Sequence, residues 1–412
     1  MIIFLFFAFI TFLGLVAYGF QIWAVRSCLS TPCSCGEGQR ETPALPRLFP
    51  PVSILKPLKG LDDNLFDNLM SFCTQDYPEY EIIFSLQNHN DPAYKIARKI
   101  EEKCPHRDIT IIVRETGAGL NPKVNNLLPA YKASKHELVL ISDSNVMVDA
   151  NYLKEITSHL VNPETGHEVG LVSNIIKGVG GRSLGAIFEN LHLNSFIMGS
   201  VCFLDKFLKM PCVVGKSMLM KKKDLEAIGG LRSVKDILAE DYVIGQRMQE
   251  SGKKVVLSKY MVQNVNEYWG MKRFLNRHTR WGKLRWKMGG GKYIFELIGN
   301  PVFMSTMPII FWQCSKLTVT FAILTSLVKI AGDFYLGRKA GTELENPFLY
   351  LLSPIKDLVI GLIWSVPIVS HTVVWRGNRY IIGKDSMLFP CPENGFWSLR
   401  YRIIDAIKGR FA

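Results

Sequence analysis

Residues 137–145 read Glu-Leu-Val-Leu-Ile-Ser-Asp-Ser-Asn, an apolar run of strand length that ends in a polar, acidic turn. Similar short runs rich in Val and Ile occur at residues 52–55, 81–86, 109–113, 169–173 and 254–258. Helical patterns alternate with them at residues 62–73, 92–102, 123–133, 149–159 and 240–250. This alternation predicts an α/β fold with a mostly parallel sheet flanked by helices. In such a sheet the ligand site lies at the carboxyl ends of the strands.

The composition fits a folded protein of more than one domain. The chain has 412 residues, which at about 150 residues per domain corresponds to two or three domains. Hydrophobic residues make up 48% and charged residues 21%, and this balance excludes a disordered chain. Lys and Arg number 49 against 36 Asp and Glu, a formal net charge of +13.

Residues 2–25 carry no charge and are long enough to cross a bilayer, which takes about 20 residues. A cleaved signal peptide would need a basic start, a shorter apolar stretch and a small-residue cleavage site, so we favour a retained N-terminal transmembrane helix. Basic residues follow this segment and none precedes it: Arg26, Arg40, Arg47, Lys56 and Lys59. The positive-inside rule therefore predicts an integral membrane protein whose next domain lies in the cytoplasm. The membrane would be that of the Golgi or the ER in a eukaryote, or the inner membrane in a bacterium.

Apolar segments return at residues 301–314, 317–335 and 355–375, the second interrupted by Lys329 and Asp333. They are either three crossings or partly interfacial helices. With the N-terminus outside and the next domain inside, three crossings would leave the C-terminus outside. The basic tail favours the cytoplasm instead, so two crossings and one interfacial segment is the other interpretation.

The predicted organisation is an anchor at 1–26, a linker at 27–51, an α/β domain at 52–290, membrane segments at 291–375 and a basic tail at 376–412. The linker is rich in Pro, Gly, Ser and Thr. Nine cysteines occur without a repeated CxxC pair, which argues against a disulfide scaffold or a structural zinc site. Cys28, Cys33 and Cys35 are either free thiols or sites of S-acylation.

Three aspartates follow predicted strands or begin a predicted helix: Asp91, Asp143 and Asp241. An aspartate in such a place is most often a helix cap when it stands alone. A fourth element, Arg277-His278-Thr279-Arg280-Trp281 on a basic helix, changes that interpretation. The order and spacing of the four elements are specific.

This pattern resembles the inverting family-2-type glycosyltransferases, and within them the ceramide glucosyltransferases. The resemblance extends over about residues 52–285 and includes the stretches 56–60, 121–127, 212–220 and 239–242. It departs at Asn88-His89-Asn90, where this family often has an acidic run, and in the region after Glu189. The resemblance implies a GT-A-like fold. It also implies transfer of glucose from UDP-glucose to the primary hydroxyl of ceramide, with inversion, to give β-glucosylceramide.

The residue types suit this chemistry. A diphosphate leaving group needs a divalent cation or fixed positive charges, and Asp143 with Asn145 offers oxygen ligands for Mg²⁺ or Mn²⁺. Lys123 begins a helical stretch, from which its ammonium can reach a phosphate; the alternative is a surface lysine. Asp241 is the predicted general base. Its neighbour Glu240 is either a supporting residue or a solvated charge.

The remaining candidates bind the donor or the acceptor. The resemblance implies that Asp91 holds the nucleoside part of the donor; a turn residue before Pro92 is the alternative. Arg277 and Arg280 share a helix face and are expected to bind the diphosphate. Trp281 is either an aromatic surface near the acceptor or a tryptophan of the membrane interface.

The basic helix also indicates what kind of partner the chain binds. Its basic residues alternate with aromatic ones, a pattern suited to an anionic membrane surface. We expect no nucleic-acid partner, because no nucleic-acid module accompanies the pattern. Three alternatives to a ceramide glucosyltransferase remain open: a glycosyltransferase with another UDP-sugar or lipid acceptor, a processive polysaccharide synthase, and a catalytically silent lipid-binding scaffold.

Overall fold

The computed structural model describes residues 1–30, 49–161, 168–210, 212–342, 344, 346–375 and 377–391. Most of the predicted linker and of the basic tail lies outside these residues, as do Cys33 and Cys35. The chain divides into two compact units. The sheet unit comprises Cys28–Val179 and Leu204–Asn266, and the helical unit comprises Met1–Ser27, Gly180–Phe203 and Glu267–Ala412.

The sheet unit is built on an eight-stranded sheet in the order β3-β2-β1-β4-β7-β6-β8-β5. Its strands are β1 Val52–Pro57, β2 Tyr80–Leu86, β3 Asp108–Val113, β4 Leu138–Ile141, β5 Val146–Met147, β6 Val169–Gly180, β7 Met218–Lys221 and β8 Lys254–Asn266. The helices of this part are α2 Leu65–Cys73, α3 Pro92–Lys103, α4 Pro122–Ala133, α5 Tyr152–Val161, α8 Lys222–Ala227 and α9 Glu240–Glu250. The predicted α/β sheet with flanking helices is confirmed.

The sheet is mixed rather than parallel throughout. Strand β1 pairs in parallel with β2 and β4, and β2 with β3. Helices α2, α3 and α4 supply the crossovers that parallel neighbours require. Strand β7 is antiparallel to β4 and β6, and β5 is antiparallel to β8. The polar residues that follow β1, β2 and β4 therefore share one edge of the sheet.

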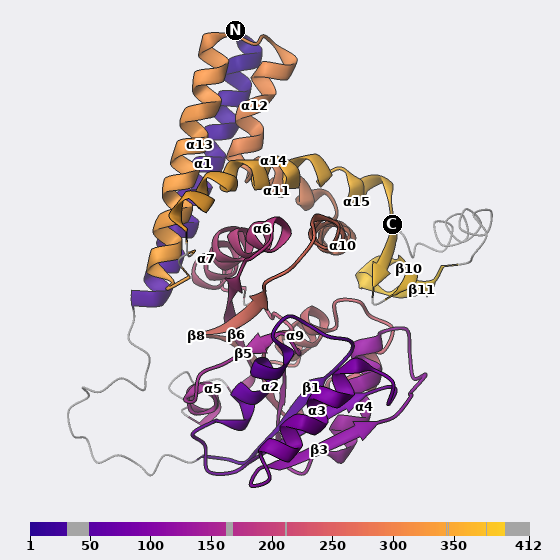
Figure 1. The fold of residues 1–412 in the computed structure, drawn as a ribbon. Coiled ribbons are helices and arrows are strands. Elements are labelled where there is room, and N and C mark those ends of the chain that lie inside the picture. The colour runs from indigo at the N-terminus through magenta and orange to yellow at the C-terminus, as the bar shows by residue number, and fades with distance from the viewer. Residues whose placement is uncertain are drawn as a thin grey trace. The chain divides into compact units, whose positions relative to one another are not determined.

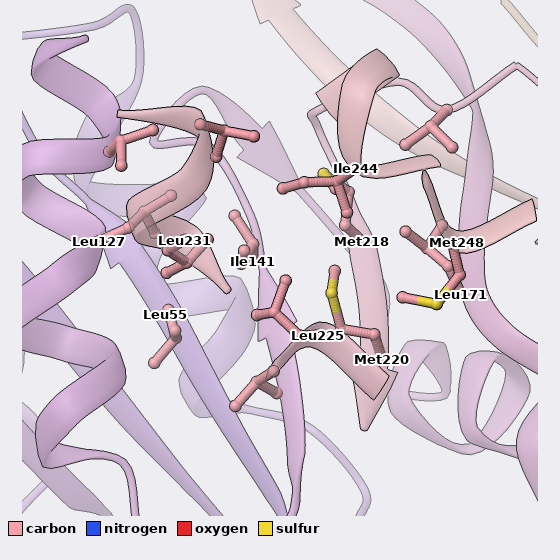
Figure 2. Packing of buried hydrophobic residues seen from close by; sticks show 14 of the residues in the cluster. Leu55, Leu127, Ile141, Leu171, Met218, Met220, Leu225, Leu231, Ile244 and Met248 are labelled. Atoms are coloured by element: carbon pink, nitrogen blue, oxygen red, sulfur yellow. The ribbon is translucent and has the colours of Figure 1, made fainter. Parts of the chain in front are cut away.

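An apolar cluster joins the sheet to its helices (Figure 2). It includes Leu55 and Ile141 from β1 and β4, Leu127 from α4, Met220 from β7 and Leu225 from α8, each at most 1% exposed. Burial of such side chains stabilises a fold by about 25 cal/mol per Å² of apolar surface. This core fixes the strands from which the acidic residues project.

The helical unit contains a bundle of α1 Ile2–Ser30, α12 Pro301–Phe311 and α13 Lys316–Lys339, which run side by side in Figure 1. Phe4 contacts Trp312 and Phe321, with ring centroids 5.7 and 5.6 Å away. The other helices are α6 Leu184–His192, α7 Met198–Leu208, α10 Met271–Gly289, α11 Ile294–Ile298, α14 Ser353–Ile363 and α15 Val366–Val369, and a π-helical turn at Leu193–Ile197 joins α6 to α7. Three short strands, β9 Thr372–Trp375, β10 Asn378–Ile382 and β11 Leu388–Pro390, form an antiparallel sheet.

Four helical stretches in the described residues are long and apolar enough to cross a membrane: Ile2–Ser30, Leu184–Leu208, Lys316–Lys339 and Pro347–Val369. The segment predicted at 301–314 is mainly α12, whose 11 residues are too few to cross alone. It qualifies only together with Met271–Ile298, from which it is bent by 73°. The segment predicted at 355–375 extends too far, because Thr372–Trp375 is a strand paired with β10.

Candidate active site

Asp143 lies just beyond β4 and is held by two lysines. Its Oδ1 is 2.9 Å from the Nζ of Lys123, and its Oδ2 is 2.9 Å from the Nζ of Lys216. The Asp143 side chain keeps 25% of its exposure, so it remains accessible. Burial raises the pKa of Asp143, but the two ammonium groups lower it by more, and the pKa lies well below its ordinary value.

Lys123 connects Asp143 to the start of α9. Its Nζ lies 2.9 Å from Oε1 of Glu240 and donates to the carbonyl oxygen of Gly215 at 3.0 Å. Asn121 caps α4 by accepting from the amides of Lys123 and Val124. This cap fixes the start of α4 and thereby the position of Lys123 in its first turn. Burial lowers the pKa of Lys123, whereas the surrounding carboxylates raise it by more, so the ammonium stays charged. A surface lysine is therefore the wrong interpretation of Lys123.

Glu240 is a buried partner of Lys123. It is 5% exposed, and its Oε2 accepts from the side-chain amide of Asn121 at 3.2 Å. Burial raises the pKa of Glu240, and Lys123 offsets part of that effect. The alternative of a solvated charge at the helix start is wrong.

Asp241 is the second residue of α9 and is oriented by backbone amides. Its Oδ2 accepts from the amide of Gly215 at 2.7 Å, and its Oδ1 accepts from the amide of Tyr242 at 2.9 Å. Gly215 thus contacts Lys123 through its carbonyl oxygen and Asp241 through its amide. The structure brings Lys123, Asp143 and Asp241 into one cluster.

Asp91 follows β2 and binds backbone amides through its carboxylate. It is the N-cap of α3, accepting from the amide of Ala93 at 2.9 Å. Its two carboxylate oxygens also accept from the amide of Gly60, at 2.9 and 3.0 Å. Gly60 has a φ of +69°, a conformation that favours glycine. The contact ties the loop after β1 to the loop after β2.

Two lysines of the cluster were not found by sequence reasoning. Lys56 is fully buried in β1 and donates to the carbonyl oxygen of Asp143 at 2.8 Å. Burial lowers the pKa of Lys56 well below its ordinary value. A lysine inside a run that otherwise looks like a buried strand was the available signal. Lys216 carried no such signal, because its position depends on how β7 pairs with β4.

Asn145 places a second oxygen beside the ammonium of Lys216, which Asp143 also contacts. Its Oδ1 accepts from the Nζ of Lys216 at 2.6 Å, while its amide donates to Oδ1 of Asn264 at 2.9 Å. One oxygen of Asp143 and one of Asn145, both of a type that binds hard metal ions, therefore face the Lys216 ammonium. Among the described residues, no group of three or more His, Cys, Asp or Glu side chains is arranged to hold a metal ion.

Arg277, Arg280 and Trp281 lie on α10 in the helical unit. Nη1 of Arg277 is 3.2 Å from Oε1 of Glu189, and its guanidinium lies 4.3 Å from the ring centroid of Trp281. The guanidinium of Arg280 lies 5.8 Å from the ring of Trp375. The shared helix is confirmed, and in this structure the two guanidinium groups contact different partners.

The chain is similar to several ceramide glucosyltransferases. It is 25% identical over 361 residues to ceramide glucosyltransferase 3 of Caenorhabditis elegans, covering 83% of this chain and 75% of that protein. It is 27% identical over 357 residues to ceramide glucosyltransferase 1 of the same organism, covering 81% and 72%. The ceramide glucosyltransferase of Komagataella phaffii is 31% identical over 209 residues, covering 46% and 40%.

Among solved structures, a mannosyltransferase from Pyrobaculum calidifontis in complex with GDP-Man and Mn²⁺ aligns with a TM-score of 0.45 and 14% identity. The alignment covers 87% of this chain and 98% of that one. The family described as Glycosyl transferase family 21 matches residues 6–388. Because this match spans most of the sequence, the chain belongs to glycosyl transferase family 21 and is an enzyme that transfers a glycosyl group.

Proposed function

We propose that this enzyme transfers glucose from UDP-glucose to the primary hydroxyl of ceramide, with inversion, to give β-glucosylceramide. The family and the names of its relatives support a glucosyltransferase that makes this class of product. The observation that carries the proposal is the cluster of Lys123, Lys216, Asp143 and Asp241. It combines a proton acceptor, Asp241, with the Asp143 carboxylate, which suits the divalent cation that a sugar diphosphate requires.

In the proposed reaction, the hydroxyl oxygen of ceramide forms a bond to the anomeric carbon of glucose. The bond from that carbon to the phosphate oxygen breaks, and UDP leaves with the electron pair. Asp241 accepts the hydroxyl proton, with its carboxylate oriented by the amides of Gly215 and Tyr242. Glu240 is the poorer candidate for this role, because Lys123 and Asn121 already engage its oxygens.

Charge balance supports a divalent cation. Lys123 faces the carboxyl groups of Asp143, Glu240 and Asp241, and Lys216 pairs with Asp143, so the lysines alone leave little positive charge for a diphosphate. Asp143 and Asn145 fit Mg²⁺ or Mn²⁺, since both place an oxygen beside the Lys216 ammonium. When bound there, such an ion would supply charge that stabilises the departing UDP. The donor-side roles of Asp91, Arg277 and Arg280, and the acceptor-side role of Trp281, stay predictions from the resemblance.

The test is a product assay with the full chain in detergent, ceramide, Mg²⁺ or Mn²⁺ and a panel of UDP-sugars, read by mass spectrometry. We expect hexosylation of ceramide from UDP-glucose alone. We expect Asp241→Asn to lower turnover by about 10²-fold or more while the Kd for UDP-glucose stays unchanged. Glu250→Gln, at the exposed C-terminal end of α9, is the control and should retain full activity.

Each other outcome identifies a different error. Transfer from another UDP-sugar would keep the mechanism and change the donor. Binding of UDP-glucose without transfer to ceramide would change the acceptor. Full activity of Asp241→Asn would remove Asp241 as the base, and a wild-type protein that binds no UDP-sugar would favour the silent lipid-binding scaffold.

A further inference from the structure

The helical unit contains a pocket of mixed polarity, with about 710 Å³ of empty space that includes part of its open mouth. Residues from α1, α6, α10 to α14 and their connections line it. The lining includes polar side chains, among them His192, Lys329 and Asp357, and apolar ones, among them Phe196, Ile360 and Trp364. Such a lining suits an amphipathic molecule with a compact polar group and hydrocarbon attached to it.

His192 is the most informative residue of the pocket. It is 3% exposed, and neither of its ring nitrogens has a hydrogen-bond partner. Its ring stacks on Phe196, with centroids 5.0 Å apart, and meets the ring of His278 edge to face at 4.5 Å. A buried polar group without a partner is costly, and most such groups in proteins are satisfied. A singly protonated imidazole offers one donor and one acceptor, which together match a hydroxyl or an amide.

A second open position lies on Asp357. Its Oδ2 is buried and accepts no hydrogen bond, although the Nζ of Lys329 lies 3.6 Å away. An O–H or N–H group of a ligand would satisfy that oxygen. His192 and Asp357 therefore offer one donor and two acceptors to whatever enters the pocket.

The charges around the pocket compensate one another. Lys329 lies 2.5 Å from Oδ1 of Asp333, and Lys356 lies 2.7 Å from Oδ1 of Asp357. Arg285 likewise pairs with Glu296 at 2.5 Å. A phosphate or a free carboxylate would find little excess positive charge in such a setting, whereas a neutral polar group needs none.

From these contacts we infer that the pocket binds the neutral amide-and-hydroxyl head of the lipid acceptor, with His192 and Asp357 as its hydrogen-bonding partners. The inference rests on the proposed function for the identity of that acceptor. The amide and the secondary hydroxyl of ceramide match the donor and acceptors left open by His192 and Asp357, while the primary hydroxyl is the group that reacts. The apolar side chains of Phe196, Ile360 and Trp364 contact the start of its hydrocarbon chains.

The test compares His192→Phe with the wild-type full chain in lipid nanodiscs. The readouts are the Kd and KM for N-hexanoyl ceramide and for its 3-deoxy analogue, together with the Kd for UDP-glucose. Phenylalanine keeps a ring but removes both nitrogens, so we expect a rise of about tenfold or more in the ceramide Kd and KM. The UDP-glucose Kd should stay within about twofold, and the preference for ceramide over its 3-deoxy analogue should shrink.

Two further variants make the result specific. His192→Gln restores a donor and an acceptor and should recover most of the ceramide affinity. His106→Phe, the same change at an exposed position of the sheet unit, should behave as wild type. If His192→Phe does not fold, Ile360→Phe tests the pocket by filling its apolar part and should likewise weaken ceramide binding alone.

Suppose that the wild-type enzyme glucosylates ceramide and that His192→Phe leaves the ceramide Kd and selectivity unchanged. This result would overturn the assignment of the pocket to the acceptor and leave the proposed function intact. Equal loss of UDP-glucose and ceramide binding in a folded variant would also overturn it, since that result indicates a general structural role. Wild-type protein that binds UDP-glucose but no ceramide would overturn the proposed acceptor, and the occupant of the pocket with it.

Discussion

Gly215 lies where the residue cluster has no room for a methyl group. A Cβ at this position would be 2.7 Å from Oδ2 of Asp241 and 3.0 Å from the Nζ of Lys123. We therefore expect Gly215→Ala to displace the Asp241 carboxylate and to lower kcat by about tenfold or more, because misplaced catalytic groups lose much of their effect. Steady-state kinetics of the purified enzyme would measure this.

The matched control is Gly117→Ala, a glycine whose added Cβ would meet no atom within 4 Å. It should leave kcat unchanged. Equal activity of the two variants would show that the contact between Gly215 and Asp241 does not matter for turnover.

Asp143 makes a pH-dependent contribution to stability. Its pKa in the folded protein lies below the value of about 4 expected in the unfolded chain, because Lys123 and Lys216 outweigh the effect of burial. The unfolded state therefore binds the proton more readily. The stabilisation is present in full above the unfolded pKa and is lost as the pH falls through it toward the folded pKa.

Thermal unfolding of wild type and Asp143→Asn between pH 3 and pH 8 tests this sign. At pH 7 we expect the variant to unfold about 4 °C lower or more, and we expect the gap to narrow below about pH 4. Asp67→Asn, at an exposed position of α2, should show no such trend. A gap that widens toward low pH would contradict the direction of the pKa shift.

At the scale of elements, the α/β alternation was predictable, whereas the direction of β7 was not. Residues 52–55 and 81–86 read as strands because their apolar runs are short and bounded by polar turns. Strand β7, with four residues, lies inside a longer mixed stretch and gives no separate pattern. Its antiparallel register, with Met218 opposite Ile141, is what sets Lys216 near Asp143. Register depends on tertiary pairing, so the role of Lys216 was not visible in the sequence.

The site was predictable to the extent that its residues lie at element ends. Asp143 and Asp241 follow a strand and begin a helix, and the sequence alone placed both together. For residues 184–208, which include His192, the sequence left two interpretations open, a lipid-entry groove and a buried core helix, because a histidine within an apolar stretch looks like any core residue until its unpartnered nitrogens are seen.

Helix α8 offers a test of the core that holds these elements. Leu225 is fully buried against the cluster around Met220 and Leu231, at the junction of helix and sheet. Leu225→Ala removes buried methyl groups and leaves a cavity, so we expect the free energy of unfolding to fall by about 2–4 kcal/mol. Chemical denaturation of the detergent-solubilised protein measures the change. Leu61→Ala, at a side chain 62% exposed, is the control, and an equal effect of both would contradict this account of the core.

At the scale of the whole molecule, the packing of the helical unit indicates which apolar segments cross the membrane and which one lies at its interface. The contacts of Phe4 with Trp312 and Phe321 put the start of α1 and the turn between α12 and α13 at the same end of the bundle. Helix α13 then runs back along α1, where Tyr18 donates to Asp333. Helix α14 runs across this bundle rather than along it (Figure 1). We therefore expect the bent pair of Met271–Ile298 and α12 to enter the membrane, α13 to return, and the stretch Pro347–Val369 to lie at the interface.

This arrangement predicts opposite sides for two native cysteines. With the N-terminus outside, as the basic residues after α1 favour, exposed Cys314 in the α12–α13 turn lies outside. Cys391, after β11, lies on the cytoplasmic side because the crossings of the bent pair and of α13 cancel. Variants that retain only one of these cysteines, in sealed vesicles of known orientation, can be labelled with a membrane-impermeant maleimide. We expect Cys314 to react from the outside alone and Cys391 only after the vesicles are opened. Labelling of both from one side would contradict an interfacial Pro347–Val369 and would require an even number of crossings between them.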